Sequence, residues 1–394
     1  MENLPFLLLA GLMLCTFFAV SFGSQKYRLP SVLLYIALGA AVSPFFLQGK
    51  LVHVAAEIGI VLLFFILGLE FPLSRMVAIS SRIWPAGVVD VALNLGGSMV
   101  LALLFGLDFF SAFVIGSIAY ATSSSISAKM LDERRRLANP EAEFILALLI
   151  FEDLVAPILV SFIAGISGGD QISATYLLVL ATKILLLVFG AAFIGYFGFR
   201  RLNTFIGKHI QTDFMPLLTV GLALGYAGLA MALGLSEILG AFMAGVMLSE
   251  SGRAREIEHM LIPARDLVLP FFFFWFGTTI DFDRGIPFMG LMAAIVLLAI
   301  AGKVITGYVG SRLFGLSPKV SCRAAFCLVQ RGEFSAVIAA LTVPTLRVFS
   351  GFYILITAFV GVYLFGQAPR IANWYQDKWV ERPSKPSRNS AKGL

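Results

Sequence analysis

The chain has 394 residues, of which 59% are hydrophobic and only 13% are charged, whereas roughly a quarter of the residues in a soluble domain are charged. Its formal net charge of +6 does not indicate a nucleic-acid-binding protein, because most Lys and Arg residues lie in short loops between apolar blocks. The three cysteines show neither metal-ligand spacing nor a disulfide framework. These features predict an integral membrane protein.

Apolar blocks of about twenty residues recur along the chain, and this length crosses a bilayer as a helix. They lack the alternation expected of barrel strands. The first block also lacks the basic segment of a signal peptide, so it counts as a span. We therefore expect an all-α polytopic protein with about thirteen transmembrane helices and almost no soluble part. The predicted spans are 5–24, 30–47, 52–71, 83–105, 109–130, 141–166, 173–197, 213–234, 236–251, 263–280, 287–313, 321–345 and 351–375.

The positions of the basic residues predict the orientation. With thirteen spans, 23 of the 29 Lys and Arg residues fall on one side of the membrane and three on the other. The positive-inside rule then places the N-terminus outside and the C-terminus in the cytoplasm, in a cell inner (plasma) membrane. The basic, Pro- and Ser-rich tail 379–394 is too short to fold and is expected to be disordered.

The fifth span contains a run of hydroxyl side chains. Thr122, Ser123, Ser124 and Ser125 are consecutive and offer oxygen ligands at a place where the helix can break. Ser and Thr also cap and pack membrane helices, so the run alone is a weak indication of a binding site.

The sixth span places Glu152 and Asp153 near the centre of the membrane. Charges there are costly, which indicates a functional site, although a structural ion pair is the alternative. Adjacent residues project about 100° apart on a helix, so we expect one carboxylate to face the ion and the other a neighbouring helix. Pro157 leaves the Asp153 carbonyl without its helical hydrogen bond.

Further charges lie in other spans. Lys303 of the eleventh span needs a carboxylate, for which Glu152 and Asp153 are the candidates, unless its side chain reaches the membrane surface. In the twelfth span, Arg331 and Glu333 flank a glycine and indicate a broken helix. We expect them to pair with each other or with carboxylates across the bundle. Asp90, Lys183, Glu57 and Glu70 have no partner that the sequence identifies.

The fifth and twelfth spans would thus both be broken, at corresponding places in the two halves of the protein. A pair of interrupted helices in such positions indicates a transporter with inverted repeats and a binding site where the repeats meet.

Several motifs in this order resemble the cation:proton antiporter-2 family over about residues 5–375. They are LPSVLLYIALGAAVSP (29–44), AEIGIVLLFFILGLEF (56–71), ATSSSISAKML (121–131), NPEAEFILALLIFEDL (139–154) and QRGEFS (330–335). Within the family, the last two are most similar to Kht-type potassium/proton antiporters, with Kef systems and bacterial sodium/proton antiporters as further relatives.

The resemblance implies the inverted-repeat fold of sodium/proton antiporters, with two broken helices that cross. It implies a homodimer embedded in membrane lipid, with a dimerisation part at about 5–71 and 213–280, a core part at about 83–166 and 287–375, and a linker helix at about 173–197. It also implies an elevator-like movement of the core. The transport carboxylate corresponds to Asp153, with Glu152 at the variable position before it.

Two features depart from these relatives. The chain ends without the cytoplasmic nucleotide-binding domain of Kef proteins, which leaves a separate soluble regulatory subunit as a possibility. Lys303 matches the sodium-transporting branch, whereas Kht-type proteins have a neutral residue there. The cation therefore stays open between K⁺, which is favoured, and Na⁺.

The main hypothesis is a secondary antiporter, not an enzyme, in which a monovalent cation and H⁺ compete for Asp153. It needs no cofactor and no nucleic acid. A partner-gated cation channel is the alternative, but the sequence has no filter-like carbonyl run. An intramembrane protease would need two aspartates on different helices with hydrolytic geometry, and no Ser or His motif supports it.

Overall fold

The computed structural model describes residues 6–27, 30–43, 50–70, 73–167, 174–199, 214–249, 251–280, 285 and 287–380. Every regular element in these ranges is a helix. The helices are α1 (Phe6–Tyr27), α2 (Ser31–Val42), α3 (Lys50–Leu69), α4 (Leu73–Asp90), η2 (Val91–Gly96), α5 (Gly97–Leu104), α6 (Phe109–Tyr120), α7 (Ser124–Glu133), α8 (Pro140–Ser167), α9 (Ala174–Phe193), η3 (Ile194–Phe199), α11 (Met215–Ala232), α12 (Glu237–Ser249), α13 (Ala254–Thr278), α14 (Met289–Leu313), α15 (Pro318–Ala325), α16 (Glu333–Ala340), α17 (Pro344–Tyr375) and η6 (Gln376–Val380).

All thirteen predicted spans contain helix, which confirms the all-α membrane fold. Within the described residues, nine helical stretches are long and apolar enough to cross a membrane, and three shorter apolar helices accompany them. The predicted span 321–345 instead holds the two short helices α15 and α16. The predicted separation of the eighth and ninth spans is also confirmed, because Gly234, with a φ of +74°, lies between α11 and α12.

Several helices are longer than the predicted spans. The helix of the fourth predicted span begins with α4 and continues through the π-helix η2 into α5. The helix of the tenth predicted span begins at Ala254, and the helix of the last one begins at Pro344. The prediction followed hydropathy, which marks only the part of a helix that matches the apolar bilayer. At the C-terminus, η6 extends the last helix to Val380, so the predicted disorder is wrong for residues 379 and 380; residues 381–394 lie outside the described residues.

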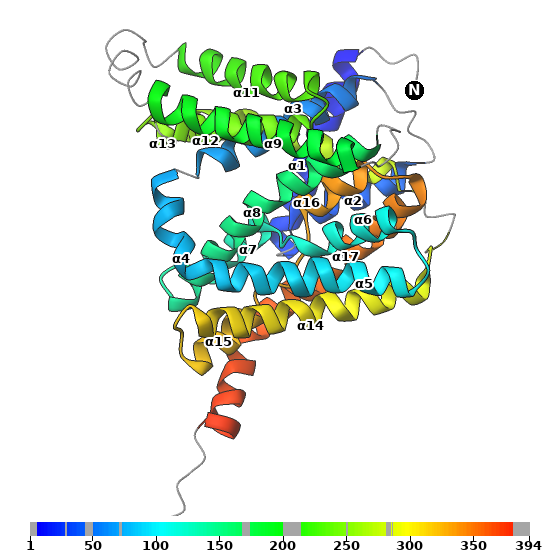
Figure 1. Ribbon diagram of the computed structural model, residues 1–394. Helices are drawn as coiled ribbons and strands as arrows, with labels where there is room; N and C mark the ends of the chain where they lie inside the picture. The colour runs from blue at the N-terminus through cyan, green and yellow to red at the C-terminus, as the bar shows by residue number, and fades with distance from the viewer. Residues whose placement is uncertain are drawn as a thin grey trace, which may run out of the picture.

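One group of helices packs through glycines. It consists of α3, α11, α12 and α13, which contact one another and lie together at the top of Figure 1, and of α2, which packs against α13. Gly39 of α2 faces Gly277 of α13, and Gly68 of α3 faces Gly245 of α12. At each of these glycines, a Cβ would collide with the backbone of the neighbouring helix. Small residues at such contacts bring membrane helices close enough for extensive van der Waals packing.

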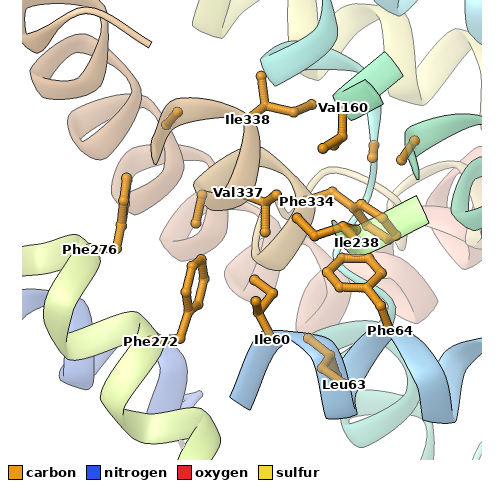
Figure 2. Packing of buried hydrophobic residues seen from close by; sticks show 14 of the residues in the cluster. Ile60, Leu63, Phe64, Val160, Ile238, Phe272, Phe276, Phe334, Val337 and Ile338 are labelled. Atoms are coloured by element: carbon orange, nitrogen blue, oxygen red, sulfur yellow. The ribbon is translucent and has the colours of Figure 1, made fainter. Parts of the chain in front are cut away.

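A second group contains α4, α5, α6, α14, α15, α16 and α17, and α8 contacts both groups. In Figure 1, α6, α7, α16 and α17 lie between α5 and α14 on one side and α11, α12 and α13 on the other. The groups meet through apolar side chains, among them Phe64 of α3 and Phe334 of α16, whose ring centroids are 4.8 Å apart. Figure 2 shows this packing, with Val160 and Ile238 beside the two rings.

Replacing Gly245 with alanine should destabilise the protein by about 1–3 kcal/mol, because overpacking a tight contact forces the backbone to move. The added Cβ would collide with the Phe65 carbonyl oxygen and lie 2.8 Å from the Gly68 Cα. Thermal melting in detergent measures the change. Gly221→Ala is the matched control, since nothing lies within 4 Å of its Cβ. Equal melting temperatures of the two variants would contradict the tight contact.

Candidate functional site

Two broken helices cross near the middle of the protein. Residues 121–123 separate α6 from α7, and residues 326–332 separate α15 from α16. The Ser123 backbone N–H donates to the Gln330 carbonyl across the crossing, at 2.9 Å between nitrogen and oxygen. Gly332 allows the close approach, because a Cβ there would collide with the Ser123 hydroxyl. The predicted breaks in the fifth and twelfth spans are thus confirmed.

Arg331 binds carbonyl groups at the crossing. Its Nε donates to the Ala119 carbonyl, near the end of α6, at 3.0 Å. Its Nη1 donates to the Leu328 and Val329 carbonyls, both at 3.3 Å. A cation at helix C-termini is favourable, since the unpaired carbonyls there have partial negative charge. The expectation that Arg331 pairs with Glu333 or another carboxylate is therefore wrong.

Glu333 binds the N-terminal end of a helix. Its carboxylate accepts hydrogen bonds from the Ser123 hydroxyl at 2.6 Å, the Ser125 hydroxyl at 3.1 Å and the Ser125 backbone N–H at 3.1 Å. These donors belong to the start of α7, where an anion is favourable. Ser123 and Ser125 thus contact Glu333, and their predicted role as cation ligands has no direct geometric support.

The two carboxylates of α8 have different partners, as their projection from the helix led us to expect. Glu152 faces a neighbouring helix break: it accepts from the Thr122 backbone N–H, and from the Thr122 hydroxyl at 3.2 Å. Asp153 accepts from the Ser124 hydroxyl, whose oxygen lies 2.8 and 2.7 Å from the two carboxylate oxygens. Pro157 lies inside the same helix.

Lys303 is fully buried and does not reach the membrane surface. Its Nζ lies 2.9 Å from Glu152 Oε1, one of the two expected partners. It also lies 2.8 and 3.0 Å from the two carboxylate oxygens of Asp90. Asp90 is thus a partner that the sequence did not identify, although a charge deep in the fourth span was visible. Asp153, the other expected partner, does not contact Lys303.

Asp153 has no cationic partner. In the described part of the chain, no Lys, Arg or His nitrogen lies within 4.0 Å of its carboxylate. The residue is only 3% exposed. A buried charge without a counter-charge is strongly unfavourable, so this carboxylate requires a proton or a bound cation. The Ser124 hydroxyl beside it offers one further oxygen. Of the predicted site residues, Asp153 and Ser124 therefore form the pair that is most available to an ion.

Known proteins resemble the whole chain. A family model described as "Sodium/hydrogen exchanger, transmembrane" matches residues 12–369. The ammonium/H⁺ antiporter subunit AmhT of Alkalihalophilus pseudofirmus is 46% identical over 98% of this chain and 100% of its own length. The K⁺/H⁺ antiporter subunit KhtU of Bacillus subtilis is 29% identical over 88% of this chain and 90% of its own. The structure of the sodium proton antiporter MjNhaP1 from Methanocaldococcus jannaschii matches with a TM-score of 0.68 and 18% identity, over 92% of this chain and 97% of that one.

Replacing Arg331 with methionine should lower the melting temperature strongly. The buried Ala119 and Val329 carbonyl oxygens would lose their donor, and each loss costs about 1–3 kcal/mol, whereas the Leu328 carbonyl would keep its hydrogen bond from the Thr122 hydroxyl. Arg370→Met is the control, because Arg370 is exposed and its substitution should change stability by less than about 0.5 kcal/mol. Thermal melting in detergent compares the two variants, and an Arg331→Met protein as stable as the control would contradict this role.

Proposed function

This chain belongs to the sodium/hydrogen exchanger family, and we propose that it is a secondary antiporter that exchanges a monovalent cation for a proton at Asp153. The family match and the antiporter names of its relatives support cation/proton exchange. One observation supports Asp153 as the site: it is a buried carboxylate beside the crossing of two broken helices, and no cationic side chain of the described residues pairs with it.

Competition at Asp153 would couple the two fluxes. A proton and a cation each neutralise the carboxylate, but both cannot occupy it together. Without either ion, the bare charge would have to pass the apolar contact between the two helix groups, which is costly. Only the loaded site would therefore change sides, so that a proton moves in one direction and a cation in the other.

The contact between the helix groups favours an elevator-like movement. Phe64 and Ile60 of α3 and Phe272 of α13 face Phe334 and Val337 of α16 in Figure 2. Such apolar contacts are non-directional, so they can form again after one group has shifted along the other. We assign the moving core to the helices around the crossing and the dimerisation part to the glycine-packed group with α1, as the resemblance implies.

A cavity provides an approach to this contact. It has a volume of about 250 Å³, lies between α3, α12 and α13 on one side and α16 on the other, and includes His53, Glu57 and Glu237 in its lining. In the predicted orientation it faces the outside. Ile60, Ile238 and Val337 also line it and belong to the apolar core between the helix groups. The carboxylates would attract cations to this entrance.

For the cation, we propose K⁺ and ammonium, with Na⁺ as a weaker substrate. K⁺ was favoured from the sequence, and the names of AmhT and KhtU include ammonium and K⁺. The two ions have similar size and charge. Ammonium would also donate hydrogen bonds to the Asp153 carboxylate and to the Ser124 oxygen.

We further propose a homodimer in the plasma membrane, with its N-terminus outside, its C-terminus in the cytoplasm and a separate soluble regulatory subunit. Both relatives are named as antiporter subunits, which supports a partner protein. The loops rich in Lys and Arg would face that subunit.

Asp153→Asn should reduce cation-driven proton movement to the level of empty liposomes, because a neutral amide carries no exchangeable proton and no negative charge to balance a cation. The protein should still fold, since removal of an unpaired buried charge does not destabilise the bundle. A pH dye inside proteoliposomes measures exchange after addition of K⁺, ammonium or Na⁺, and thermal melting measures folding.

Glu143→Gln is the matched control for this variant. Glu143 lies on the same helix, its side chain is 69% exposed, and its ion pair within the described part of the chain is with Arg82. The Glu143→Gln protein should exchange cations for protons at the rate of the unmodified protein. Proton-coupled exchange near the normal rate in Asp153→Asn would refute Asp153 as the site. A wild-type protein that responds to Na⁺ alone would refute the proposed cation.

The dimer is testable by native mass measurement in lipid nanodiscs. We expect a mass of two chains, because exposed apolar side chains such as Leu7, Phe18 and Phe22 on α1 offer an apolar surface. Cysteine cross-linking at Cys15, which lies on this helix and is exposed, should link the two copies. A single-chain mass without cross-links would contradict the dimer.

A further inference from the structure

Lys303 is held by two carboxylates rather than one. Its Nζ lies 2.8 and 3.0 Å from the Asp90 carboxylate oxygens and 2.9 Å from Glu152 Oε1. All three side chains are fully buried. The ammonium group has three N–H donors, so these contacts can use all of them. Removal of Glu152 from the network would still leave Lys303 with a counter-charge.

Asp90 is positioned by a second layer of contacts. The Asn94 amide donates to Asp90 Oδ1 at 2.9 Å and to the Thr306 hydroxyl at 3.2 Å. Gly302 makes room for Asn94, because a Cβ there would lie 2.8 Å from the Asn94 amide oxygen. Asn94 lies in the π-helix η2, which begins immediately after Asp90. Such π segments occur frequently at functional sites.

The other charges at the crossing have different partners. Arg331 binds backbone carbonyls, Glu333 binds the start of α7, and Asp153 contacts Ser124. Among the described residues, Arg331 makes no ion pair with Asp90, and Asp153 makes none with Lys303. Both Asp90 oxygens thus contact Lys303, and Asn94 supports one of them, whereas Glu152 also binds the backbone of Thr122.

We propose that Asp90 is the permanent counter-ion of Lys303 and keeps this lysine charged throughout transport. The inference rests on the proposed function and specifies its stoichiometry. Only Asp153 would then gain and lose a proton: on one side its proton leaves as a cation binds, and on the other side the cation leaves as a proton binds. Lys303 keeps its three protons. One proton is exchanged for one monovalent cation, and no net charge crosses the membrane.

The voltage dependence of exchange in proteoliposomes tests this inference. At a membrane voltage of about 100 mV, each net charge moved per cycle shifts the equilibrium cation gradient roughly fiftyfold. The wild-type protein should show no such shift with K⁺ or ammonium. In Asp90→Asn, Lys303 keeps only Glu152 and can release a proton as the cation binds, so the gradient should become voltage-dependent.

Two further variants complete the test. Asp266→Asn, at an exposed carboxylate of α13 that pairs with Arg265, should behave like the wild type. The double variant Asp90→Asn with Lys303→Gln has no lysine to release a proton, so its exchange should again be independent of voltage. If the single change Asp90→Asn prevents folding, the double variant is measured in its place. A voltage-dependent cation gradient with the double variant would overturn the inference.

The outcomes separate the inference from the proposed function. A wild-type protein that exchanges cations for protons and moves net charge would overturn only the inference. A folded Asp90→Asn protein that keeps voltage-independent exchange would overturn it as well. A folded wild-type protein without any cation-dependent proton movement would instead refute the proposed function.

Discussion

The cost of burying charge determines the organisation of this protein. Six ionisable side chains meet at the crossing, and five of them have partners that offset this cost. Lys303 is shared by Asp90 and Glu152, Arg331 binds backbone carbonyls at the end of α6 and in the break before α16, and Glu333 binds a helix N-terminus. Asp153 alone lacks a counter-charge among the described residues. The other charges thus balance one another, and Asp153 is the carboxylate to which we assign the transported ion.

Helix breaks and buried charges depend on each other here. The interrupted helices expose backbone N–H and C=O groups within the membrane, where water cannot satisfy them. Arg331 and Glu333 bind these groups with the sign that each helix end favours. The hydroxyl run is divided in the same way, because Thr122 contacts Glu152, Ser124 contacts Asp153, and the other two serines contact Glu333. Most polar side chains at the crossing thus bind one another or the exposed backbone groups, and few of them are available to an ion.

The sequence was sufficient to predict the spans, the two breaks and the different hydrogen-bond partners of Glu152 and Asp153. These follow from hydropathy, composition and helix geometry, which are local properties. The partners of Lys303 and Arg331 were not predictable in this way. Lys303 and Asp90 are 213 residues apart, and their contact depends on how α4 and α14 are rotated toward each other. Likewise, a sequence does not show that an arginine binds carbonyl groups rather than the nearest carboxylate.

The hydrogen bond from Arg331 to the Ala119 carbonyl has a consequence for biosynthesis. The two residues are 212 positions apart, so the end of α6 enters the membrane long before its donor is made. At about 5–20 residues per second, translation of that interval takes roughly 10–40 seconds. During this time the exposed carbonyls of the first half must be satisfied by water, lipid headgroups or an insertion factor. The first half of the chain, which contains α6, is therefore an intermediate during synthesis. Its hydrogen bonds are complete only after the segment with Arg331 has left the ribosome.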